Sequence, residues 1–99
     1  MAYAQATKVP ISQSKGEIEE LLRVRAGASH IGSMTGPEGS FILFTLGGRN
    51  YRIRIPEAES GGDDRVKAQR ERSIWRSVQL VVKSLVVAHE EGIFDLSRS

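Results

Sequence analysis

The feature that most constrains the fold is the glycine pair at 47–48, which separates two runs of strand-forming residues. The run 41–46 consists of phenylalanine, isoleucine, leucine and threonine, and the run 49–55 mixes arginine with tyrosine and isoleucine. Glycine readily adopts the positive φ angles that a two-residue hairpin turn demands, so the pair predicts a tight hairpin. Pro56 ends the second strand, because proline has no amide hydrogen to donate.

The hairpin also determines which side chains share a face of the sheet. With glycines 47–48 as the loop, Phe44 lies opposite Tyr51 and Ile42 lies opposite Ile53. These four side chains therefore share one face, which we expect to be the core face. The opposite face carries a mixture of apolar, polar and cationic side chains, namely Phe41, Leu43, Thr45, Asn50, Arg52 and Arg54.

A short helix is predicted before the hairpin. Ser14 and Glu17 have the spacing of a capping box, in which each side chain bonds the other's amide. Apolar residues follow at helical spacing, and Gly27 is a natural helix end. The prediction is a helix over 15–26.

A longer helix is predicted near the C-terminus. Apolar residues recur at helical spacing from Ile74 onward, and Gly92 stops the pattern. Asp63 or Asp64 is suited to cap its N-terminus, whereas the highly charged segment 65–72 is expected to fray or to become ordered with a partner. The apolar stripe is wider than a three-stranded sheet needs, which predicts a homo-oligomer formed through this helix.

The expected architecture is a single α+β domain over 1–99: a short helix, a three-stranded antiparallel meander and a long C-terminal helix, in two layers. The first strand is expected at 29–34. Residues 1–7 are expected to form a flexible arm, and residues 57–64 a linker before the second helix. The apolar tail 93–96 is expected to dock on the domain.

Composition argues against several classes of protein. The chain of 99 residues contains no cysteine, which excludes disulfides and thiolate metal sites. Its apolar runs are far shorter than the ~20 residues of a membrane span, and its N-terminus lacks a signal-peptide pattern. We therefore expect a cytoplasmic protein without membrane contact, located in the host cytoplasm if it is encoded by a phage.

The sequence also lacks a recognisable catalytic or metal-binding pattern. Neither His30 nor His89 is part of a nucleophile and base arrangement. The acidic residues of 57–64 lack the spacing of a calcium loop. We therefore expect no enzymatic activity, no cofactor and no metal ion.

Charge is distributed unevenly along the chain. Nine basic and five acidic residues give the segment 49–83 a charge of +4, whereas the net charge of the whole chain is +2. A local basic field favours an anionic partner, although a solvated surface of mixed charge remains an alternative. Arginine beside an aromatic ring suits a nucleotide, because the guanidinium pairs with phosphate and the ring stacks on the base.

The candidate ligand-binding residues follow from this chemistry. Two interpretations stay open for the sheet, since the stems of Arg52 and Arg54 are also suited to pack over Phe41 and Leu43. Basic side chains near a helix N-terminus suit an anion, and Trp75 is suited to stack, to join the core or to contact a subunit. The candidates are Arg52, Arg54, Arg65, Arg70, Phe41 and Trp75.

Several segments resemble a family of small phage-encoded proteins. They are 9–11, the strand end Arg52-Ile53-Arg54-Ile55-Pro56, and the helix opening at Trp75-Arg76. The overall arrangement resembles the anti-Thoeris sponge proteins of phages, which are non-enzymatic oligomers that sequester cyclic ADP-ribose-type immune signals. The resemblance implies a phosphate-binding arginine pocket with an aromatic stacker at a subunit interface.

Three functions follow as hypotheses. The first is sequestration of a nucleotide-derived anionic small molecule that serves as an immune signal. The second is binding of nucleic acid through the sheet face or the arginine-rich helix start, which predicts steep salt dependence. The third is inhibition of a host protein through Phe41, Leu43 and the tail 93–96.

Overall fold

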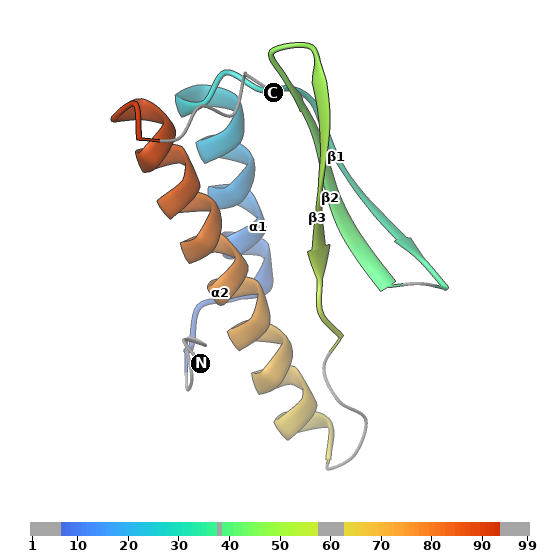
Figure 1. Ribbon diagram of the computed structural model, residues 1–99. Helices are drawn as coiled ribbons and strands as arrows, with labels where there is room; N and C mark the ends of the chain where they lie inside the picture. Colours follow the sequence, from blue (N-terminus) through green and yellow to red (C-terminus); the bar gives the residue numbers. More distant parts are fainter. Residues whose placement is uncertain (1–6, 38, 58–62, 94–99) are drawn as a thin grey trace.

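The computed structural model describes residues 7–37, 39–57 and 63–93. Its two layers are visible in Figure 1, where the helices lie side by side on one face of the sheet and leave the other face open. This arrangement confirms the predicted α+β fold. The elements in chain order are α1 (Ile11–Glu20), the π-helical turn η1 (Leu21–Arg25), β1 (Ser29–Gly36), β2 (Gly39–Leu46), β3 (Arg49–Ile55) and α2 (Asp64–Glu90).

The sheet is an antiparallel meander in the order β1-β2-β3. Phe44 pairs with Tyr51 and Ile42 pairs with Ile53, which confirms the predicted register. Gly47 and Gly48 have φ angles of 61° and 81°, as a type I′ turn requires. The hairpin therefore forms as its local sequence predicts.

Strand β1 is longer and less regular than predicted. It extends to Gly36, and its pairing with β2 shifts between Ser29 and Gly32. His30 lies within this shift and has a φ of 54°, which is uncommon for a residue with a side chain. The irregularity is a bulge that bends this edge of the sheet.

Helix α1 begins earlier than predicted. Pro10 is its N-cap, and the Pro10 carbonyl accepts hydrogen bonds from the amides of Gln13 at 3.1 Å and Ser14 at 3.2 Å. Ser14 lies inside the helix, fully buried, and its hydroxyl has no partner. The predicted capping box is therefore wrong: Pro10, which needs no amide partner, starts the helix one turn upstream, and Glu17 pairs with Arg76 of α2 instead.

Helix α2 is continuous from Asp64, so the expectation that 65–72 frays is wrong. The Asp63 side chain caps the helix by accepting a hydrogen bond from the Val66 amide at 3.0 Å. Further along this segment, the Gln69 side chain donates to the Thr7 carbonyl at 2.9 Å. The cap and this contact hold the charged first half of α2 in place.

The remaining segment predictions fall mostly on residues outside the described ranges. Of the expected arm, linker and tail, the described residues are Thr7, Glu57, the first two residues of α2 with its cap, and Ile93. Ile93 is 81% exposed.

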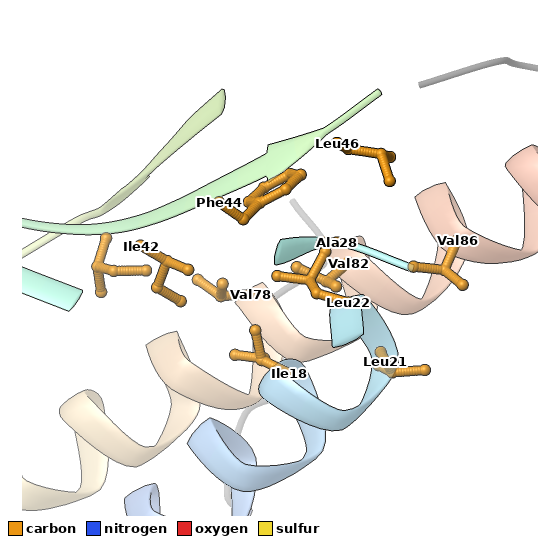
Figure 2. Close-up of a cluster of buried hydrophobic side chains, with 11 residues drawn as sticks. Ile18, Leu21, Leu22, Ala28, Ile42, Phe44, Leu46, Val78, Val82 and Val86 are labelled. Carbon is orange, nitrogen blue, oxygen red and sulfur yellow. The ribbon is translucent and has the colours of Figure 1, made fainter. Parts of the chain in front are cut away.

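The core lies between the helix layer and the inner face of the sheet (Figure 2). Val82 and Val86 of α2 are almost completely inaccessible to solvent. They pack with apolar side chains of α1, η1 and β2, chiefly Ile18, Leu22, Ile42 and Phe44. Because all of this burial is on the inner face, the outer face of the sheet remains free.

Two ion pairs join the helices, which run in the same direction (Figure 1). Arg76 donates to Glu17 at 2.6 Å. Arg25 of η1 makes a two-pronged contact with Glu90, in which its Nε lies 3.2 Å from Oε2. The hydrogen bond from Arg25 lowers the pKa of Glu90 from its ordinary value, and the same bond raises the pKa of Arg25.

Candidate anion-binding site

The outer face of β2 and β3 is the most cationic sheet surface that the structure describes. Cross-strand pairing sets Phe41 against Arg54 and Leu43 against Arg52. The Arg52 guanidinium carbon lies 4.7 Å from the centre of the Phe41 ring, which is cation–π distance. Phe41 itself is only 6% exposed. Cationic and apolar neighbours therefore cover the ring, and little of it is left to stack on a base.

Arg52 and Arg54 are exposed, and no carboxylate among the described residues lies within ion-pair distance of either. Thr45 donates to the side-chain oxygen of Asn50 at 2.8 Å, so the remaining polar groups of this face satisfy each other. We name the set outer face and define it by its residues: Phe41, Leu43, Thr45, Asn50, Arg52 and Arg54. It carries two positive charges and no acidic residue.

Two more of the predicted residues belong to another surface. Arg65 and Arg70 are exposed on the first half of α2. Because α2 lies across the inner side of the sheet, these two arginines are not part of the outer face (Figure 1). The amphipathic pattern of the sequence did not reveal this separation.

Trp75 also lies on the inner side, half-buried at the edge of the core. The Lys15 ammonium is 4.6 Å from the centre of its ring, a contact that nothing in the local sequence signals. Trp75 borders a cavity of about 380 Å³ that Lys67, Glu57 and Glu71 also line. The two carboxylates oppose the binding of an anion there. The structure thus joins Arg52 with Phe41 and places Trp75 in a different environment.

The described residues offer no arrangement for metal chemistry. No group of three histidine, aspartate or glutamate side chains within 7–37, 39–57 and 63–93 is placed to hold a metal ion. The His30 ring contacts the neighbouring Ser29 hydroxyl, with 3.0 Å between Nδ1 and Oγ. In the same ranges, no helix combines the length and the apolar character that crossing a membrane requires.

Comparison with known proteins returned no relative. No family model matches the chain, and neither the curated proteins nor the solved structures contain a significant match.

Proposed function

We propose that the protein is a non-enzymatic binding protein that sequesters a nucleotide-derived anionic small molecule on its outer face. The observation that carries the proposal is the pair Arg52 and Arg54, two positions apart on β3, on a face without acidic residues. Such a pair spans about 7 Å along a strand. Guanidinium groups at this spacing are suited to contact neighbouring phosphates of one ligand.

The biological role proposed here rests on the resemblance to anti-Thoeris sponge proteins. A protein of that kind holds an immune signal such as a cyclic ADP-ribose isomer and thereby counteracts host defence. The same resemblance places the protein in the host cytoplasm. Because Phe41 is covered, the phosphates rather than the base supply most of the recognition in this proposal.

The first test is to identify what the purified protein carries. The protein is denatured by heat, the precipitate is removed, and the supernatant is examined by absorbance at 260 nm and by mass spectrometry. A single species of nucleotide size supports sequestration. An empty supernatant, together with no change in melting temperature on adding cyclic ADP-ribose isomers, counts against it.

A matched pair of variants then tests the site. The double variant Arg52→Gln/Arg54→Gln removes both cations of the outer face, and we expect ligand affinity to fall about 100-fold from the loss of two charged hydrogen bonds. The control Arg23→Gln/Lys83→Gln removes the same charge from exposed positions on η1 and α2. Equal losses in both variants would assign the effect to net charge and reject the site.

Binding of nucleic acid is the second candidate, and the openness of the outer face favours it. A flat cationic surface suits an extended phosphate backbone, which needs no enclosing pocket. This function predicts that the logarithm of affinity falls linearly with the logarithm of salt concentration. Removing Arg52 and Arg54 should reduce that slope by about 1.5. Heterogeneous oligonucleotides in the heat-released supernatant would favour this candidate over the first.

We also propose a homo-oligomer formed through α2. Leu80 and Val87 lie two helical turns apart and are 43% and 38% exposed, which is unusual for side chains of this size. Light scattering on the wild type and on Leu80→Gln/Val87→Gln tests the proposal. A monomeric wild type would refute it. Inhibition of a host protein through Phe41, Leu43 and the tail 93–96 has weaker support, because Phe41 is buried and residues 94–96 lie outside the described ranges.

A further inference from the structure

Strand β3 is a regular edge of the sheet, and no other described strand pairs with its outward side. In an antiparallel ladder, alternate residues bond to the neighbouring strand. Counted from the pair Leu46 and Arg49, which closes the two-residue turn, the residues between the bonded ones direct their amide and carbonyl groups away from β2. They are Asn50, Arg52 and Arg54. The opposite edge, β1, is interrupted by its bulge, which makes it a poorer template.

An apolar groove of about 220 Å³ runs beside this edge, between β3 and α2. Val81 of α2 borders it and is 56% exposed. Arg54 and Ser77 contribute to the lining, and no acidic side chain does. The remaining lining is apolar: Ile53, Pro56, Ile74 and Val78. The β3 edge therefore has an apolar surface on its inner side and arginines on its outer side.

We propose that the β3 edge docks an extended segment of a partner protein in which apolar and acidic residues alternate, added as a fourth strand of the sheet. The side chains of an added strand point alternately to the two faces. Those on the inner side enter the groove beside Ile53 and Val81. Those on the outer side meet Arg52 and Arg54, whose charge no described carboxylate compensates.

Charge distinguishes this occupant from a second copy of the chain. If two β3 edges paired antiparallel around a two-fold axis, the residues facing each other on the outer side would be Arg52, Arg54 and Asn50 of both copies. Like charges directly opposite each other destabilise a sheet. The arginines therefore oppose pairing of β3 with itself and favour a strand that carries carboxylates.

The test uses a fluorescent seven-residue peptide of alternating valine and glutamate, the length of β3. Its binding is compared with that of a peptide of the same composition in which the valines are contiguous. We expect the alternating peptide to bind about tenfold more tightly, because only alternation fills the groove and reaches the arginines at once. Equal affinity for the two peptides would overturn the proposal.

A matched pair of valine variants tests the groove. Val81→Gln should weaken the alternating peptide about tenfold through loss of one buried valine. Val24→Gln is the control, since Val24 is 65% exposed on η1, away from the groove. Neither variant alters the outer face, so a failure here is distinguishable from a failure of nucleotide binding. Equal weakening by both variants, or by neither, would overturn the proposal.

Amide hydrogen exchange measured by NMR tests the backbone contact. The amides of Arg52 and Arg54 should exchange rapidly in the free protein and at least about tenfold more slowly with the peptide bound, because a new ladder bond protects them. A peptide that contacts only the arginine side chains would leave their exchange unchanged and overturn the proposal. Protection of both amides in the peptide-free protein, with a dimer in light scattering, would assign the edge to a second copy and overturn it too.

Discussion

Replacing Ser14 with alanine should stabilise the protein, although the local sequence predicts the opposite. In the structure Ser14 is the fourth residue of α1, has an exposure of 0%, and places its hydroxyl where no partner reaches it. A buried hydroxyl without a hydrogen bond costs about 1–3 kcal/mol. Alanine also has a higher helix propensity than serine, by up to about 0.5 kcal/mol.

The expected gain in the free energy of unfolding for Ser14→Ala is about 1–2 kcal/mol, after allowing for the contacts that the oxygen atom makes with its neighbours. Equilibrium unfolding in urea, followed by circular dichroism, measures it directly. The melting temperature should rise by about 4–8 °C for each kcal/mol in a domain of this size. Ser12→Ala is the matched control, because Ser12 is exposed in the same helix and should respond through propensity alone, by a few tenths of a kcal/mol.

The sign of the effect distinguishes the two descriptions of this helix start. A serine that caps a helix loses about 1 kcal/mol of stability on replacement with alanine. A loss of that size for Ser14→Ala, with Ser12→Ala near neutral, would refute the placement of Ser14 inside α1 and restore the capping box.

Three further substitutions test the structure. Asp63→Ala should lower the free energy of unfolding by about 1 kcal/mol through loss of the α2 cap, and Asp64→Ala should cost less than half as much because its side chain does not cap; urea unfolding compares the two. The lowered pKa of Glu90 means that its pair with Arg25 contributes stability above the ordinary glutamate pKa of about 4.3 and loses it as the pH falls through the lowered pKa, so Glu90→Gln should remove this part of the acid dependence. Melting curves from pH 7 to pH 3 would show no difference between wild type and Glu90→Gln if the pair is absent. Val86→Ala should cost about 2 kcal/mol by leaving a cavity in the core, and a cost below about 0.5 kcal/mol would contradict the packing in the structure.

The hairpin was predictable because its determinants are local. Glycines 47–48 impose the turn, the turn imposes the register, and the register divides alternate residues between the two faces. Nothing distant in the sequence is needed for these steps. The placement of Arg52, Arg54 and Phe41 on one face followed by the same reasoning.

The start of α1 and the surroundings of Trp75 were not predictable in this way. Pro10 and Ser14 both carry helix-start signals, and the choice between them depends on packing against α2. The partners that decide these positions are far away in the sequence: Arg76 contacts Glu17, and Lys15 contacts Trp75. Local patterns contain no information about such contacts, so the candidate site was assembled from residues that the fold then separates.

Arg54 belongs to both proposed surfaces, and this limits what its substitution can reveal. Its side chain lies on the outer face and also lines the groove between β3 and α2. Loss of Arg54 should therefore weaken a phosphate ligand and an acidic strand alike, and the two ligands should compete for the protein. Val81 lies only on the groove side, and the outward backbone amides of β3 matter only to an added strand. A variant at Val81, together with amide exchange at Arg52 and Arg54, therefore separates strand addition from anion binding, whereas substitution of the arginines alone does not.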